Sequence, residues 1–208
     1  MKSEADHNAE RPHTHPGCFI ALEGPDDGGK STQTARLVAL LRDQGYDVVV
    51  CRDPGSTSVG DRLRGIVLDR ASVHLSLRAE MLIFMASRAQ LVEEIISPSL
   101  AAGRVVISDR YLLSNLVYQG YAGGLPIEEI WSVGKVATGG LLPDLTLVLD
   151  LSHEAARKRS GAASDRIEDR PTEYHHRVRE GFLEAAQPAS TSDGTRLRYP
   201  APVRLIDA

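Results

Sequence analysis

Apolar residues follow two alternating spacings along the chain. Short unbroken apolar runs such as "CFIALEG" (18–24) are typical of strands buried on both faces, whereas leucine and valine spaced three or four residues apart, as in 29–44, indicate helices. The predicted strands are 18–24, 47–53, 104–111, 144–151 and 202–208, and the predicted helices are 29–44, 58–69, 77–102 (bent at Pro98), 112–138 (broken around 122–126) and 172–187.

Five strands separated by helices predict an α/β fold with three α/β/α layers. The strands would form a five-stranded parallel sheet, joined by right-handed crossovers and covered by helices on both faces. Ligands of such sheets gather at the carboxyl ends of the strands. Polar residues stand at these ends: Gly24 onward, Arg52-Asp53, Asp109-Arg110 and Asp150.

Composition and charge argue against some classes of protein. A chain of 208 residues suits one domain, predicted over 17–208, preceded by a polar segment, 1–16, that is expected to be disordered. A net charge of −4 argues against a general nucleic-acid binder, and no apolar run is long enough to cross a bilayer. Cys18 and Cys51 fall in predicted strands and are expected to be buried thiols, so the cytoplasm is the expected location.

Residues 24–31 match the phosphate-loop pattern, with Gly24 followed after four residues by Gly29-Lys30-Ser31. A strand precedes the loop and a helix follows it, so backbone N–H groups would face phosphates, Lys30 would bridge the terminal phosphates and Ser31 would ligate magnesium. A chance glycine-rich turn is the alternative. The predicted ATP-binding residues are Gly24, Pro25, Asp26, Asp27, Gly28, Gly29, Lys30, Ser31 and Thr32.

Asp109 closes the apolar run "VVIS" and is the second predicted magnesium ligand. A helix cap is its alternative role, but Arg110 beside it favours a catalytic site.

Five segments together carry a family resemblance. They are "FIALEGPDDGGKSTQ" (19–33), "RDPGST" (52–57), "FMASRAQ" (84–90), "SDRYLLSNLVYQG" (108–120) and "DRIE" (165–168). From about Phe19 to Gln187 the chain resembles thymidylate kinase. The resemblance implies a phosphate-loop kinase fold, transfer of the γ-phosphoryl group of MgATP to dTMP, and a homodimer.

The resemblance also implies roles for residues in the acceptor half of the site. The implied substrate-binding residues are Asp53, Phe84, Arg88, Arg110, Asn115, Tyr118 and Gln119. Phe84 would stack on thymine, Arg88 would donate to a base carbonyl, Arg110 would grip the monophosphate, Asn115 would contact the base and Tyr118 would close over the deoxyribose. Without the resemblance, Phe84 reads as a core residue, and Asn115 and Gln119 as parts of a surface helix.

The two acidic residues of the loop receive different interpretations. The resemblance implies that Asp26 faces the 3′-hydroxyl group of the acceptor sugar and the metal, whereas Asp27 is interpreted as pointing to solvent. The lid is assigned to about 157–171, with arginines at 157, 159, 166 and 170. The implied catalytic residues are Lys30, Asp26, Arg110 and Arg166.

Two alternatives stay open. One is a related kinase that acts on another nucleotide or on a deoxynucleoside, because pocket geometry sets selectivity. The other is a nucleotide-binding module that has lost catalysis, favoured by departures from the family pattern such as Asp53 for glutamate and Ser56 for glycine. Intact Lys30, Ser31 and Arg110 count against the module.

Overall fold

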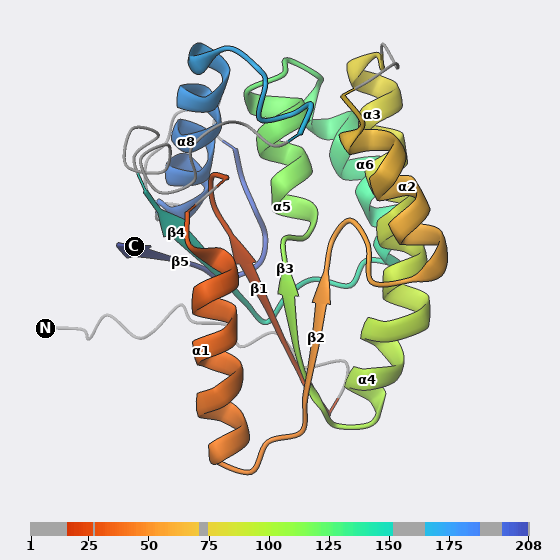
Figure 1. Ribbon diagram of the computed structural model, residues 1–208, viewed down its shortest axis with the longest axis vertical. Helices are drawn as coiled ribbons and strands as arrows, with labels where there is room; N and C mark the ends of the chain where they lie inside the picture. Colours follow the sequence, from red (N-terminus) through yellow and green to blue (C-terminus); the bar gives the residue numbers. More distant parts are fainter. Residues whose placement is uncertain (1–15, 27, 71–74, 152–164, 188–196, 208) are drawn as a thin grey trace, which may run out of the picture.

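The sheet has five parallel strands. The computed structural model describes residues 16–26, 28–70, 75–151, 165–187 and 197–207. The strands are β1 (Cys18–Glu23), β2 (Val48–Arg52), β3 (Val105–Asp109), β4 (Leu145–Asp150) and β5 (Val203–Asp207), in the order β2-β3-β1-β4-β5 (Figure 1). This confirms the five predicted strands. The expected tail, apart from Pro16, and the arginines at 157 and 159 lie outside the described residues.

Helices connect the strands as the spacing predicts. They are α1 (Lys30–Asp43), α2 (Ser58–Leu68), α3 (Leu77–Leu91), α4 (Ser97–Ala101), α5 (Leu112–Asn115), α6 (Ile127–Thr138) and α8 (Thr172–Ala186), with wider π-helical turns η1 (Val92–Ile96) and η2 (Leu116–Tyr121). The irregularity in the long helix starts at η1, before Pro98, which lies in the first turn of α4, where a missing N–H costs little.

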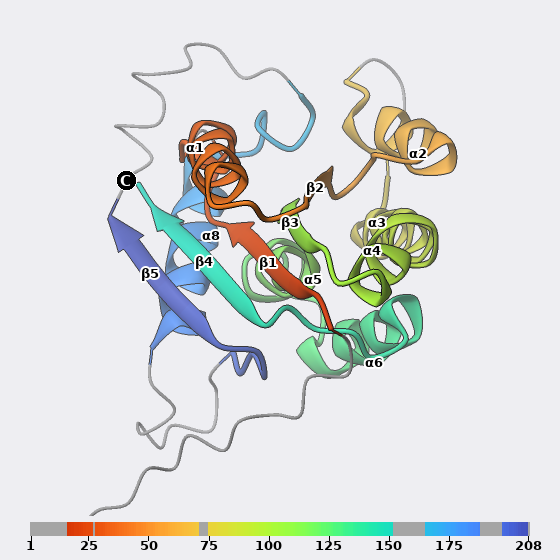
Figure 2. The same ribbon diagram turned by 90° about the horizontal axis from the view of Figure 1, so that it is seen from below.

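Alternate residues of the central strands face opposite layers. Leu22 and Ile107 pack toward Val38 of α1, whereas Phe19 and Val106 belong to the larger core under α3, α5, α6 and α8. Figure 2 shows α1 on one side of the sheet and α5 and α8 on the other. The three-layer architecture is therefore confirmed.

Strand register brings the carboxyl ends together. Asp109 pairs with Leu22 of β1 and with Arg52 of β2, so the turns after these three strands are neighbours. Asp150, at the end of β4, is instead held by both ends of the Arg179 guanidinium group from α8, at 2.7 and 2.8 Å. The carboxyl ends of β1, β2 and β3 thus position the site.

Both cysteines are free thiols, Cys51 buried and Cys18 half-buried. Within the described ranges, no helix combines the length and the apolar character needed to span a bilayer.

Candidate active site

The loop between β1 and α1 depends on glycine. Gly24 and Gly29 have φ angles of 131° and 81°, a region that side chains disfavour. A Cβ atom on Gly24 would lie 2.3 Å from the carbonyl oxygen of Leu149 in β4. No side chain caps the amino end of α1, so its N–H groups are available to an anion. Asp27 lies outside the described residues.

Lys30 lies folded over this loop. Its side chain is nearly buried, and its Nζ atom donates to the carbonyl oxygens of Pro25 (2.6 Å) and Gly24 (3.3 Å). Burial, together with the nearby Arg110, lowers the pKa of Lys30 to about 8, although Asp26 opposes the shift. The ammonium group is therefore held against the backbone of the loop.

Arg110 joins the loop to the end of β3. Its backbone adopts a left-handed φ of 71°, unusual for a residue with a side chain, and its N–H group donates to the carbonyl oxygen of Leu22 (2.9 Å). Its guanidinium group donates to the carbonyl oxygen of Gly24 (2.8 Å) and to a carboxylate oxygen of Asp26 (2.5 Å). The strained backbone thus directs this cation across the loop.

Tyr118 of η2 completes the cluster. Its hydroxyl group donates to Asp26 (2.9 Å) and accepts from Arg110 (3.1 Å), and the Arg110 Cζ atom lies 5.1 Å from the ring centroid. Burial alone would raise the pKa of Asp26, but Arg110 and Lys30 outweigh it, so the net effect lowers that pKa. Asp26 therefore stays ionised as the counter-charge of Arg110.

Glu23 lies beneath Arg110 and escaped sequence reasoning. Its fully buried carboxyl group accepts from the N–H groups of Tyr111 (2.8 Å) and Ser114 (3.2 Å) and from the Ser114 hydroxyl group (2.5 Å). Burial raises the pKa of Glu23 to about 7, against the opposing charge of Arg110 and these hydrogen bonds. The group fixes the turn that carries Arg110.

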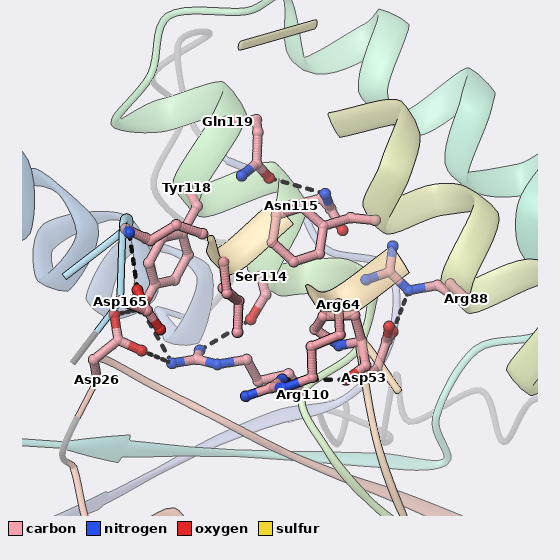
Figure 3. Close-up of a pocket in the computed structure, with 14 residues that line it drawn as sticks. Asp26, Asp53, Arg64, Arg88, Arg110, Ser114, Asn115, Tyr118, Gln119 and Asp165 are labelled. Carbon is pink, nitrogen blue, oxygen red and sulfur yellow. Dashed lines mark hydrogen bonds and ion pairs between the residues drawn. The ribbon is translucent and has the colours of Figure 1, made fainter. Parts of the chain in front are cut away.

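One pocket gathers the predicted acceptor residues. Its lining includes all seven predicted substrate-binding residues together with Asp26. Figure 3 shows Asn115 and Gln119 at one end of the pocket and Asp26 and Arg110 at the other. Phe84 is half-buried on the pocket wall, although it also packs against the core. The arrangement separates the two amide side chains from the Asp26–Arg110 pair.

Arg88 and Asp53 form a buried ion pair in this pocket. The Arg88 Nε atom lies 2.6 Å from a carboxylate oxygen of Asp53, and both side chains are almost fully buried. Arg88 also donates to the Met85 sulfur atom (3.2 Å) and to the carbonyl oxygen of Tyr111 (3.2 Å). Asp53 thus fixes the direction in which Arg88 points.

A second network ends at Glu80 of α3. Asn115 donates to Gln119 (2.9 Å), and Gln119 donates to Glu80 (2.8 Å). Arg166 and Arg170 donate to the other carboxylate oxygen of Glu80, at 2.5 and 2.6 Å. Arg166, predicted as the catalytic lid arginine, is thus engaged with α3 here, and its catalytic role stays a prediction.

Sequence reasoning also missed Arg64 and Asp165, which line the pocket. Arg64 of α2 donates to the carbonyl oxygen of Pro54 (3.1 Å), and burial followed by the nearby Arg52 lowers its pKa. In the sequence Arg64 is one of several arginines on a polar helix, so only the packing of α2 against the loop after β2 distinguishes it.

The predicted magnesium ligands are oxygen donors. Ser31 lies in the first turn of α1 and is exposed, and Asp109 is half-buried at the end of β3. The described part of the chain holds no group of three or more acidic, cysteine or histidine side chains suited to a metal. Magnesium suits such a sparse set, because it is usually bound by one or two protein oxygens together with substrate phosphates.

The fold and the loop geometry define a phosphate-loop nucleotide-binding protein with a pocket beside the loop. The family model described as thymidylate kinase matches residues 22–192. The chain belongs to the thymidylate kinase family.

Individual relatives agree with this assignment. The chain is 47% identical over 168 residues to the thymidylate kinase of Caldanaerobacter subterraneus subsp. tengcongensis, covering 80% of both chains. It is 48% identical over 177 residues to that of Clavibacter sepedonicus, covering 83% of both. The crystal structure of thymidylate kinase from Ehrlichia chaffeensis superposes with a TM-score of 0.72 at 28% identity, covering 91% of this chain and 92% of that one.

The buried Asp53–Arg88 pair yields a stability prediction. Asp53→Asn should lower the free energy of unfolding by about 3–5 kcal/mol, because it leaves the buried Arg88 charge without a counter-ion. Urea denaturation measures the change. The matched control is Glu129→Gln in the exposed pair with Arg78 (3.8 Å), which should cost less than about 1 kcal/mol. Equal losses in the two variants would contradict the importance of the buried pair.

Glu23 yields a pH prediction. Its pKa of about 7 in the folded protein exceeds the ordinary value of 4.5, so the folded state binds the proton more tightly than the unfolded state. The stability that Glu23 contributes should be fully present below pH 4.5 and lost as the pH rises through 7, by up to about 3 kcal/mol. Glu23→Gln removes this titration.

The measurement is the free energy of unfolding of the wild type minus that of Glu23→Gln, from pH 4 to pH 8. The difference should fall as the pH rises. A difference that stays flat or increases would show that Glu23 is ionised throughout.

Proposed function

We propose that this protein transfers the γ-phosphoryl group of MgATP to dTMP, giving dTDP and ADP. Membership in the thymidylate kinase family supports this reaction, and so does the pocket that lies beside the phosphate loop. ATP would occupy the loop between β1 and α1, and dTMP the pocket lined by Phe84 and Arg88.

The position of Arg110 carries the proposal. Its guanidinium group contacts the Gly24 carbonyl oxygen and Asp26 on the donor side, and Ser114 and Tyr118 on the acceptor side. These contacts use four of the five N–H donors of the group. A cation at this junction can bind the acceptor phosphate and stay beside the group being transferred.

The base and sugar would be recognised at the other end of the pocket. Phe84 offers a ring for stacking, and Arg88, held by Asp53, offers donors to a base carbonyl. Asn115 would contact the base, and Gln119 would line the same wall. Tyr118, fixed between Asp26 and Arg110, would pack against the deoxyribose and disfavour a 2′-hydroxyl group.

Transfer needs no general base. The attacking oxygen belongs to a phosphate whose second pKa is about 6, so it is largely ionised at neutral pH. Catalysis is then alignment of two anions and neutralisation of their charge by Lys30, Arg110 and, near the acceptor phosphate, Arg64. Ser31 and Asp109 would hold Mg²⁺, which neutralises charge on the ATP phosphates. Asp26 would accept from the 3′-hydroxyl group of the acceptor.

We propose Arg166 as the catalytic arginine of the lid. Arg166 and Arg170 both lie on Glu80, so a role at the phosphates would require them to leave it. Closure of the segment around them would exclude water and so prevent hydrolysis of ATP.

A homodimer and a cytoplasmic location are part of the proposal. Exposed apolar side chains on the adjoining helices α2 and α3, among them Val59, Ile66 and Leu82, support pairing of two copies through this region.

The direct test is ADP release from MgATP with dTMP, dUMP, dGMP, thymidine or no acceptor. Turnover selective for dTMP supports the proposal. Preference for thymidine would indicate a nucleoside kinase, and silence with intact ATP binding would indicate a module without catalysis.

Arg110→Ala should lower kcat/KM for dTMP by at least about 10³-fold, because a cation at the transferring group is lost. Its affinity for ATP, measured by calorimetry, should change by less than about threefold. Arg177→Ala, on the exposed side of α8, is the matched control and should behave as the wild type. Parallel losses of ATP affinity and turnover would mean that Arg110 serves the donor site.

A further inference from the structure

Glu80 lies at the end of a chain of side-chain hydrogen bonds that reaches the Asn115 end of the pocket, called the base pocket below. It is fully buried, and its carboxylate can only accept hydrogen bonds. One of its oxygens accepts from the Gln119 amide nitrogen at 2.8 Å. The Gln119 side chain is therefore held with its NH₂ group toward Glu80 and its oxygen toward Asn115.

The direction of donation in this hydrogen-bond chain also fixes the orientation of Asn115. The Gln119 oxygen accepts from the Asn115 amide nitrogen at 2.9 Å, which leaves the Asn115 oxygen on the other side of that amide. This oxygen is buried and has no hydrogen-bond partner among the described residues, although the Asn115 side chain lines the pocket. A buried acceptor without a partner is costly, so it indicates a donor supplied by a ligand.

The fixed acceptor stands in a pocket that also offers donors. Three of the five N–H groups of Arg88 are engaged by protein atoms, which leaves two for a ligand. Figure 3 shows the Asn115 amide between Gln119 and Arg88. Thymine presents an N3–H donor between two carbonyl acceptors, whereas cytosine presents an acceptor at N3 and an amino donor at C4. An acceptor beside guanidinium donors therefore fits thymine and opposes cytosine.

We propose that Glu80 is a positioning residue for base selection, which holds the Gln119 and Asn115 amides in the orientation that accepts from N3–H of the acceptor base. This inference rests on the proposed function, because it assumes that dTMP occupies this pocket.

Two arginines bind the other carboxylate oxygen of Glu80. Arg166 and Arg170 donate to its second oxygen at 2.5 and 2.6 Å, which leaves the first oxygen for Gln119. Arg170 also donates to the Tyr174 hydroxyl group, and that hydroxyl group donates to the backbone of Tyr118 (2.7 Å). The segment around 165–170 thus holds the acceptor that sets the polarity of the base pocket.

A purely structural role for Glu80 predicts a different result. If Glu80 acted only as a buried counter-ion, its loss would loosen the pocket and lower turnover with every acceptor alike. Loss of the fixed orientation of the Gln119 and Asn115 amides instead affects only the preference between bases that differ at N3. dUMP separates the two roles, because uracil carries the same N3–H and carbonyl groups as thymine and lacks only the methyl group.

The test compares kcat/KM for dTMP, dUMP and dCMP in the wild type and in Glu80→Gln. The substituted amide can donate or accept a hydrogen bond. The amide groups of Gln119 and Asn115 can then rotate by 180°, which exchanges the positions of their oxygen and nitrogen atoms. We expect the ratio of dTMP to dCMP to fall at least about tenfold, while the ratio of dTMP to dUMP changes less than about twofold. The control is Glu94→Gln, the same substitution in the exposed Gln90–Glu94 pair (2.9 Å), which should change neither ratio.

A second variant keeps the inference testable if Glu80→Gln folds poorly. Gln119→Met preserves length but removes the acceptor that orients Asn115, and it should lower the ratio of dTMP to dCMP by a similar factor. Because Glu80 acts through Gln119, the double variant should discriminate no worse than Gln119→Met alone. Additive losses would overturn the inference.

The two proposals fail separately. If the wild type does not phosphorylate dTMP, the proposed function is wrong. If the wild type prefers dTMP to dCMP and both variants keep that ratio, the proposed function stands and the role of Glu80 is overturned. Equal falls in the dUMP and dCMP ratios also overturn it, since they indicate general loosening.

Discussion

The contact between Arg110 and Asp26 is the charged link between two turns that strand pairing and backbone hydrogen bonds already place side by side. One turn follows β1 and forms the phosphate loop, and the other follows β3 and leads into the acceptor pocket. The 2.5 Å contact places opposite charges at their junction, and it explains why a loop built for anions carries a carboxylate. With Arg110 and Lys30 beside it, Asp26 balances a surplus of positive charge in the site without ligands.

Buried carboxylates support the groups that would touch substrate. Glu23 fixes the turn that carries Arg110, Asp53 orients Arg88, and Glu80 orients Gln119. Burying a carboxylate is costly unless hydrogen bonds or counter-charges compensate it. Here that cost is offset by the two apolar cores on either side of the sheet, and the result is a pocket whose donors and acceptors are oriented before a ligand arrives.

The local sequence was sufficient for some features and not for others. Apolar spacing located all five strands, and the phosphate loop was evident because its glycines, lysine and serine are adjacent. Glu80 and Glu23 were missed because their partners lie far away in sequence: Arg166 is 86 residues from Glu80, and Tyr111 is 88 residues from Glu23. The role predicted for Arg166 at the phosphates rests on a motif that carries no information on which neighbour this side chain contacts.

The central claim is that one cation serves both nucleotides at the junction of the two turns. A crystal structure with dTMP and a non-hydrolysable ATP analogue tests it most directly. The account predicts the Arg110 guanidinium group within hydrogen-bond distance of the dTMP phosphate, with thymine against Phe84. Arg110 turned away from both phosphates, with Phe84 packed apart from the base, would contradict it.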